Sequence, residues 1–236
     1  MIVSIGNFLF RFRNGLFPAA LLLVLLPGRD LFANPLHAVA LGFCVALLGQ
    51  MVRGATIGFQ YVIRGGRNKR VYAEDLVTEG VYRVCRNPMY VGNLLIMAGL
   101  AVASNSLTCL LVAIPLFVFV YIAIIAAEEA FLRRKFGAAY AQYVADVPRW
   151  LPRLGAMGEA LADMSFHWMR VLVKEFATPF GWITMLMLMS FWHMTTHQDI
   201  IGRRDIARAL LVGYIALAVV YLTVRYLKLS RRIVAD

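Results

Sequence analysis

LVTEGVYRVCRNPMYVGN, residues 76–93, is a polar, aromatic and basic loop that runs directly into a long apolar segment. Its single proline, Pro88, stands where the apolar segment begins, and proline is favoured in the first turn of a helix. A second polar cluster follows, because the apolar run 107–127 ends at the adjacent acids Glu128 and Glu129. Both clusters lie at ends of apolar helices, and together they predict a single site.

The composition indicates that the bilayer is the solvent of this chain. Of its 236 residues, 61% are apolar and only 16% are charged, and the mean hydropathy is +0.71. Soluble domains average about 45–50% apolar and about 25% charged residues. We therefore predict an integral membrane protein. The net charge of +11 requires no nucleic acid partner, because anionic headgroups of membrane lipids attract basic flanks.

The apolar runs predict an all-α fold, a polytopic transmembrane bundle. A helix needs about 20 apolar residues to cross a bilayer, so about five to six spans are expected, with the shorter runs tilted or partly inserted. The first run lacks a small-residue exit and meets Pro27, Gly28 and Arg29, which favours a retained segment over a cleavable signal. The candidate spans are residues 15–26, 35–59, 88–103, 107–127, 179–194 and 206–227.

The basic residues predict the orientation. If every span crosses, nearly all of them fall on one side, which the positive-inside rule assigns to the cytoplasm. We expect a bacterial inner-membrane protein whose N-terminus and cofactor pocket are cytoplasmic. Arg203 and Arg204, beside Asp199 and Asp205, are the exceptions. The basic residues on the cytoplasmic side are Arg11, Arg13, Arg64, Arg67, Lys69, Arg70, Arg83, Arg86, Arg133, Arg134, Lys135, Arg149, Arg153, Arg225, Lys228, Arg231 and Arg232.

The cysteines and histidines predict no metal site. Cys44, Cys85 and Cys109 have no metal or redox spacing. Cys85 lies in the polar loop, but a thiol without a partnering base is a weak candidate nucleophile. His193 and His197 share one helical face, yet no third ligand stands near them in the sequence.

Structural roles remain open for both polar clusters. The two acids suit a helix that leaves the bilayer, with Glu129 and Arg133 as a pair four residues apart. Asn87 and Pro88 suit a helix cap and first turn. Pattern alone does not separate these roles from a functional one.

The combination of motifs resembles the isoprenylcysteine carboxyl methyltransferase and phospholipid methyltransferase superfamily of integral membrane enzymes. The motifs lie within residues 67–152 and are a G-x-Y-R loop, an R-x-P-x-Y-x-G helix start, a helical hairpin turning at residues 104–106, a Glu pair, F-G-x-x-Y and V-P-R-x-x-P. The resemblance implies methyl transfer from S-adenosylmethionine by a helical membrane fold. We expect a methyltransferase core over residues 1–154. Residues 155–236 are then an extension of the same bundle, with an interfacial helix at 158–176 and two further hydrophobic segments.

The resemblance also assigns roles to residues of this chain. A carboxylate suits the ammonium group of the cofactor, and tyrosines suit its adenine and sulfonium. From their placement, Arg86, Tyr90 and Glu129 are the candidates for the chemistry: Arg86 to orient an acidic group, the other two to assist loss of a proton. The implied cofactor-binding residues are Leu76, Val77, Tyr82, Asn87, Pro88, Met89, Tyr90 and Glu128.

Two departures from the resemblance bear on the methyl acceptor. The isoprenylcysteine branch usually has His where this chain has Asn87, and N-P-M-Y is more similar to phosphatidylethanolamine N-methyltransferases. The substrate-contacting Arg of the isoprenylcysteine branch falls here on Ile124. We expect a lipid or another hydrophobic acceptor, with N-methylation ahead of carboxyl or thiol methylation. An NADPH-dependent membrane reductase and a non-enzymatic membrane protein are the alternatives.

Overall fold

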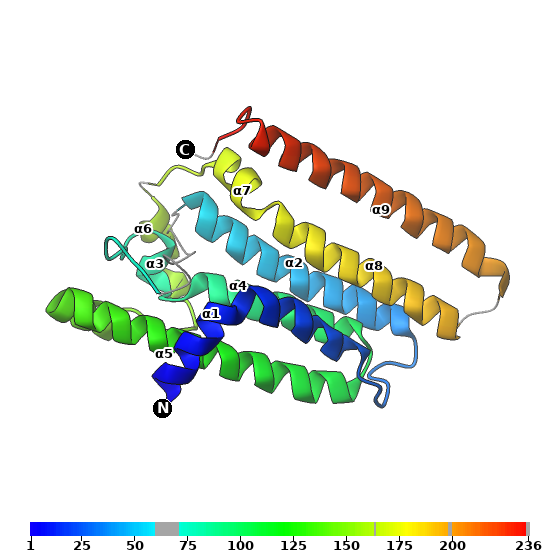
Figure 1. Cartoon of the computed structure of the whole chain (residues 1–236), viewed down its shortest axis with the longest axis horizontal. Helices are drawn as coiled ribbons and strands as arrows, with labels where there is room; N and C mark the ends of the chain where they lie inside the picture. The colour runs from blue at the N-terminus through cyan, green and yellow to red at the C-terminus, as the bar shows by residue number, and fades with distance from the viewer. Residues whose placement is uncertain (60–70, 163, 198–199, 235–236) are drawn as a thin grey trace.

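The computed structural model describes residues 1–59, 71–162, 164–197 and 200–234, and these residues form a bundle of helices with no strand (Figure 1). The all-α prediction is confirmed. In chain order the elements are α1 (Ile2–Ala20), η1 (Leu21–Leu25), α2 (Pro35–Phe59), α3 (Val81–Val84), α4 (Pro88–Ala103), α5 (Leu107–Asp146), η2 (Leu154–Ala156), α6 (Met157–Leu161), α7 (Trp168–Glu175), α8 (Ala177–His197) and α9 (Ile200–Leu229).

The helix boundaries agree with the predicted spans where local signals mark them. Helices α2 and α4 have the predicted ends, and each begins at a proline. Ser106 caps α5 by accepting a hydrogen bond from the backbone N–H of Cys109 at 3.2 Å, which closes the predicted hairpin. Helix α5 continues past the predicted end at residue 127, however, because the polar sequence beyond it remains helical.

Two predicted segments differ from the structure. The first helix begins at Ile2 rather than at residue 15, and only its last part, with η1, covers the predicted run. The single interfacial helix predicted over 158–176 is wrong, since α6 and α7 are separate helices and residues 164–167 are helical in neither. The reason is an anchor on α2: the backbone N–H of His167 donates to the carbonyl of Gly58 at 2.9 Å, and the Phe166 ring packs on Phe59.

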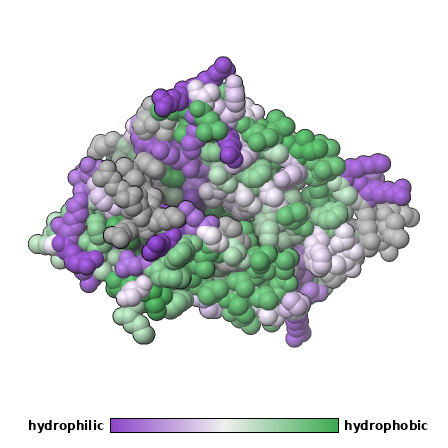
Figure 2. All heavy atoms as spheres, in the orientation of Figure 1, coloured by the Kyte–Doolittle hydropathy of each residue, from purple (hydrophilic) through white to green (hydrophobic). Residues whose placement is uncertain are grey.

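The apolar helices make this an integral membrane protein. By length and composition, three helices of the described residues can cross a membrane, at Pro35–Phe59, Leu107–Asp146 and Arg204–Leu229, and a fourth span arises if α7 and α8, bent by 57°, count as one. Helix α4 is apolar but shorter. Hydrophobic residues cover the middle of the bundle, and hydrophilic residues gather towards its ends (Figure 2).

Small residues let α2 and α4 approach closely. A Cβ atom added to Gly42 would lie 2.4 Å from the carbonyl oxygen of Gly99, and one added to Gly49 would lie 2.6 Å from that of Gly92. Such contacts between small residues are a common basis of helix association in membranes, where no hydrophobic effect drives the helices together. The contact fixes the start of α4, and hence the polar loop, relative to α2.

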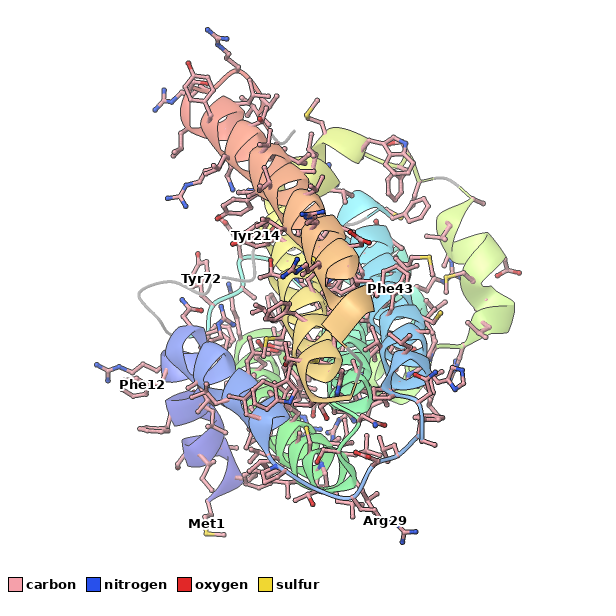
Figure 3. All side chains as sticks on the ribbon, turned by 90° about the vertical axis from the view of Figure 1, so that its right-hand side faces the viewer. Met1, Phe12, Arg29, Phe43, Tyr72 and Tyr214 are labelled. Atoms are coloured by element: carbon pink, nitrogen blue, oxygen red, sulfur yellow. The ribbon has the colours of Figure 1, made fainter. Side chains whose placement is uncertain are left out.

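The C-terminal helices pack on the same bundle. Trp182, Leu186 and Met189 of α8 form a buried cluster with residues of α2 and α4, and Phe180 of α8 stacks on Tyr221 of α9 at 4.2 Å between ring centroids. Helix α9 lies outermost, against α8 (Figures 1 and 3). Helix α1 packs along α5 on another flank, where the ring of Phe12 points outward (Figure 3).

Candidate active site

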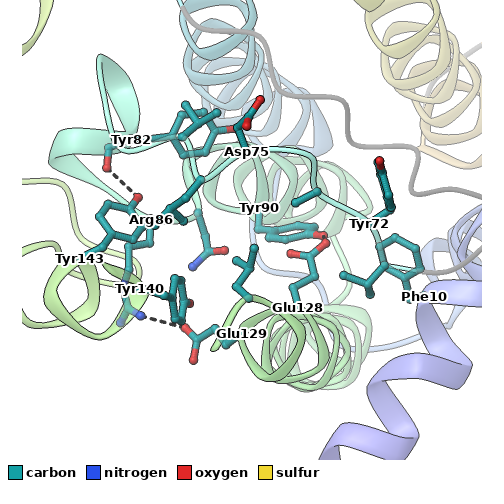
Figure 4. Close-up of a pocket in the computed structure, with 16 residues that line it drawn as sticks. Phe10, Tyr72, Asp75, Tyr82, Arg86, Tyr90, Glu128, Glu129, Tyr140 and Tyr143 are labelled. Carbon is teal, nitrogen blue, oxygen red and sulfur yellow. Dashed lines mark hydrogen bonds and ion pairs between the residues drawn. The ribbon is translucent and has the colours of Figure 1, made fainter. Parts of the chain in front are cut away.

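A pocket opens at the end of the bundle where α4 begins and α5 leaves its apolar segment (Figure 4). The free space within it, its open mouth included, is about 860 Å³. The lining comes from α1, the loop before α3, α3, the start of α4, and α5. The lining residues are Phe10, Val71, Tyr72, Ala73, Asp75, Leu76, Val77, Tyr82, Arg86, Asn87, Tyr90, Glu128, Glu129, Leu132, Tyr140 and Tyr143.

The structure brings together all the predicted site residues except two. Leu76, Val77, Tyr82, Arg86, Asn87, Tyr90, Glu128 and Glu129 line this one pocket. Pro88 and Met89 do not line it; both are buried in the first turn of α4. The two polar clusters of the sequence therefore meet, as predicted.

Glu128 and Tyr90 form a pair at the wall of the pocket. The Tyr90 hydroxyl donates to Glu128 Oε1 at 2.7 Å (Figure 4). Below them the Tyr90 ring packs on the ring of Tyr121, with centroids 5.1 Å apart. A carboxylate bordered by aromatic rings can bind a ligand cation through charge and through the ring faces.

Glu129 has a different environment, although it is the adjacent residue. Its Oε1 accepts from Arg86 Nη1 and Arg149 Nε, each at 3.0 Å, and its Oε2 accepts from Arg149 Nη2 at 2.6 Å. The residue is only 7% exposed. Glu129 thus joins two arginines from distant parts of the chain, and this pairing replaces the one considered with Arg133.

Backbone hydrogen bonds attach the segment after α5 to the polar loop. The N–H of Arg86 donates to the carbonyl of Pro148 at 2.9 Å, and the N–H of Arg153 donates to the carbonyl of Val84 at 3.1 Å. Asn87 precedes α4, but its side chain makes no cap hydrogen bond there. Instead its amide donates to the carbonyl of Arg149 at 3.1 Å. The V-P-R motif therefore holds the R-x-P motif in place.

Cys85 is part of this packing. Its thiol donates to the carbonyl of Trp150 at 3.3 Å, and the residue is only 2% exposed. Burial raises the pKa of the Cys85 thiol above its ordinary value of 9.0. A buried thiol that resists ionisation is a poor nucleophile. The structure therefore favours a packing role for Cys85 over a role as a nucleophile.

Two glycines in left-handed conformation shape the pocket. Gly80 has φ 57° and precedes α3, and Gly137 has φ 51° and kinks α5. L side chains rarely adopt this region, which explains the glycines of G-x-Y-R and F-G-x-x-Y. Beyond the kink, the Tyr143 hydroxyl donates to the Tyr82 carbonyl at 2.8 Å. The kink thus brings Tyr140 and Tyr143 to the pocket.

The loop before α3 is fastened to α5 by Lys135, whose Nζ donates to the carbonyl of Glu74 at 2.8 Å. Sequence reasoning identified Leu76 and Val77 of this loop. It missed Val71, Tyr72, Ala73 and Asp75 of the same loop and Phe10 of α1, since no motif marks them. It also missed Tyr140 and Arg149, although both lie in quoted motifs that could have indicated them. Arg64, Arg67, Lys69, Arg70 and Asp199 lie outside the described residues.

Within the described ranges, no three His, Cys, Asp or Glu side chains gather where they could hold a metal ion. The fold and the pocket together define the class: an integral membrane helical protein with a pocket of polar and aromatic side chains at one end of its bundle.

Comparisons with known proteins give the family. The model of the family "Phospholipid methyltransferase" matches residues 37–139. The nickel-cobalt-cadmium resistance protein NccN of Alcaligenes xylosoxydans xylosoxydans is 30% identical over 64% of this chain and 69% of its own length. The cobalt-zinc-cadmium resistance protein CzcN of Cupriavidus metallidurans is 40% identical over 34% of this chain and 36% of its own length.

The protein-S-isoprenylcysteine O-methyltransferase of Schizosaccharomyces pombe is 34% identical over 48% of each chain. The chain thus spans about a third to two thirds of these curated relatives, and no solved structure matches it significantly. The chain belongs to the superfamily of integral membrane methyltransferases that includes phospholipid and isoprenylcysteine methyltransferases.

Proposed function

We propose that this protein transfers a methyl group from S-adenosylmethionine to a hydrophobic acceptor dissolved in the membrane. The observation that carries the proposal is the pair of Glu128 and Tyr90 in an aromatic pocket at the end of an apolar bundle. This position allows a water-soluble cofactor and a membrane-dissolved acceptor to meet. Membership of the methyltransferase superfamily supports the same reaction class.

The lining residues fit the chemical groups of S-adenosylmethionine. The Glu128 carboxylate suits its ammonium, and the rings of Tyr82 and Tyr90 suit its adenine and sulfonium. Leu76 and Val77 add apolar wall and Asn87 an amide. Pro88 and Met89, which do not reach the pocket, would serve by shaping the start of α4 that presents Tyr90.

When bound, S-adenosylmethionine would supply an electrophilic methyl group on a sulfonium whose leaving group is a neutral thioether. The residues of this chain have to orient the acceptor and exclude water. Such orientation is worth about 7–11 kcal/mol in favourable cases. Arg86 faces the pocket as a cation and can orient an acidic group of the acceptor.

An amine acceptor must also lose a proton. Tyr90, whose hydroxyl is already hydrogen-bonded to a carboxylate, is the candidate for assisting that loss. Glu129 is less suited to the task than its sequence position indicates, because both of its oxygens accept hydrogen bonds from guanidinium groups. We assign it the role of holding Arg86 in place.

The N-P-M-Y sequence supports a phospholipid amine as the acceptor ahead of a carboxylate or thiol. The cytoplasm is the proposed side of the pocket, in a bacterial inner membrane, because the basic flanks share that end by the positive-inside rule. Lipids of that membrane are the expected surroundings of the outer helices.

Binding of S-adenosylmethionine and S-adenosylhomocysteine to the purified protein in nanodiscs tests the proposal. We expect both to bind, and Glu128→Gln to weaken the binding. Glu159→Gln, an exposed acid on α6, is the matched control and should leave the binding unchanged. Transfer of labelled methyl to a lipid extract then identifies the acceptor. A folded wild type that binds neither compound but binds NADPH would overturn the proposal in favour of a reductase.

A further inference from the structure

A separate group of polar side chains, which does not line the pocket, lies inside the bundle: Arg53, Asn93, Glu175 and Thr178. Arg53 of α2 donates through Nη1 to Asn93 of α4 and through Nη2 to the Glu175 carboxylate, which ends α7. Nη2 also lies 3.3 Å from Thr178 Oγ1 on α8. The side chains of Arg53 and Glu175 are 13% and 3% exposed. Charges in apolar helices are costly and rare, and they occur mostly where function requires them.

The helix packing is shaped to admit Arg53. A Cβ atom added to Gly92 would lie 2.5 Å from Arg53 Cγ, so a side chain at this position of α4 would collide with the arginine. Gly92 directly precedes Asn93 and belongs to the R-x-P-x-Y-x-G motif. The glycine of the motif therefore leaves room beside α4 for the Arg53 side chain, which also reaches Glu175 on α7.

From this cluster a continuous series of contacts leads to the pocket. The Asn93 side chain lies within reach of the Tyr121 hydroxyl. The Tyr121 ring packs on that of Tyr90, and the Tyr90 hydroxyl donates to Glu128. Arg53 itself does not line the pocket. It can act on the bound cofactor only through these intermediates.

We propose that Arg53, held by Glu175, is a positioning residue for the cofactor site. It fixes Asn93 and Tyr121 and thereby the ring of Tyr90, which orients Glu128 for the cofactor ammonium. The inference rests on the proposed function, since it assumes that the pocket binds S-adenosylmethionine. It also gives the C-terminal extension a task, because Glu175 and Thr178 lie outside the matched family segment, residues 37–139.

A purely structural ion pair has to be distinguished from a positioning one. Removing one partner of a buried pair leaves the other charge unpaired, and this alone destabilises a protein. The double variant Arg53→Met with Glu175→Met removes both charges and keeps bulky apolar side chains, a replacement that is often neutral for stability. If the double variant folds, a loss of affinity can therefore be attributed to the position of Tyr90 rather than to loss of folding.

The experiment measures thermal unfolding and S-adenosylhomocysteine affinity of the full chain in nanodiscs. We expect the double variant to unfold near the wild-type temperature yet bind the compound about 5- to 150-fold more weakly, the usual range of coupling between two sites. The control is Gln50→Leu, because Gln50 also links α2 to α8, accepting from Trp182 Nε1 at 3.0 Å, and does not line the pocket. It should leave the affinity unchanged.

A double variant that is stable and binds with wild-type affinity would overturn the positioning role. If the double variant does not fold, Tyr121→Phe decides instead. It removes only the hydroxyl that meets Asn93, and it should weaken binding by about fivefold, the value of one hydrogen bond; unchanged affinity would overturn the role. A folded wild type that does not bind the compound would instead refute the proposed function itself.

Discussion

Glu128 and Glu129 are adjacent acids, and the structure predicts opposite consequences of neutralising them. Glu129→Gln removes the anion between Arg86 and Arg149. The side chains of Glu129 and Arg86 are 9% and 10% exposed, so this pair is buried, and breaking it from one side costs about 3–5 kcal/mol. The Arg149 side chain is 42% exposed, so water screens its ion pair with Glu129. We expect that ion pair to contribute about 1 kcal/mol or less to stability.

Glu128→Gln keeps the hydrogen bond with Tyr90, because a carboxamide oxygen still accepts from the hydroxyl. We expect a loss of stability under about 1 kcal/mol, since the hydrogen bond with Tyr90 is weakened rather than lost. Cofactor affinity should fall about 10- to 150-fold, because a hydrogen bond to a charged group contributes about 1.5–3 kcal/mol.

Denaturant unfolding followed by tryptophan fluorescence, with titration of S-adenosylhomocysteine into each folded variant, measures both quantities. Arg149→Ala is a further comparison, with an expected loss of about 1 kcal/mol. If Glu128→Gln and Glu129→Gln have the same free energy of unfolding, the structural role of Glu129 is refuted. A stable Glu128→Gln protein with wild-type affinity would refute the assignment of Glu128 to the cofactor.

Three further predictions concern the scaffold. Gly49→Leu should separate α2 from α4 and lower stability by about 1–3 kcal/mol or more, whereas Gly181→Leu, with open space around its Cα, should not; thermal unfolding in detergent compares them. Gly80→Ala should cost about 1–3 kcal/mol, because φ 57° with ψ −133° is a conformation that L side chains rarely adopt, and an unchanged midpoint in denaturant would contradict the structure of the loop. Cys85 should react with maleimide only after unfolding, since burial raises its thiol pKa and thiolate stays scarce through pH 8; rapid labelling of the folded protein, located by peptide mass spectrometry, would contradict its burial.

Sequence patterns predicted the spans where a local signal marks the end of a helix. Proline defines the start of α2 and of α4, and the three polar residues of the hairpin define the end of α4. Hydropathy reports where the membrane ends rather than where a helix ends. The prediction for α5 therefore stopped near the acids, while the helix itself continues in polar sequence to Asp146.

The pocket was predicted in part for a similar reason. Residues within one motif, such as Tyr90, were identified because the motif itself carries the signal. Phe10 and Tyr72 come from other parts of the chain and enter only through packing. Arg53 did carry a signal, a lone charge within an apolar run, although its partner Glu175 could not be inferred without the fold.

The pairing of Arg53 with Glu175 joins residues 122 positions apart in the chain. During synthesis the arginine leaves the ribosome long before its acid exists, and the C-terminal extension is made last. A nascent or truncated chain that ends before Glu175 therefore carries an uncompensated cation in an apolar helix. The packing around Arg53 on α2 is therefore complete only once α7 has been made.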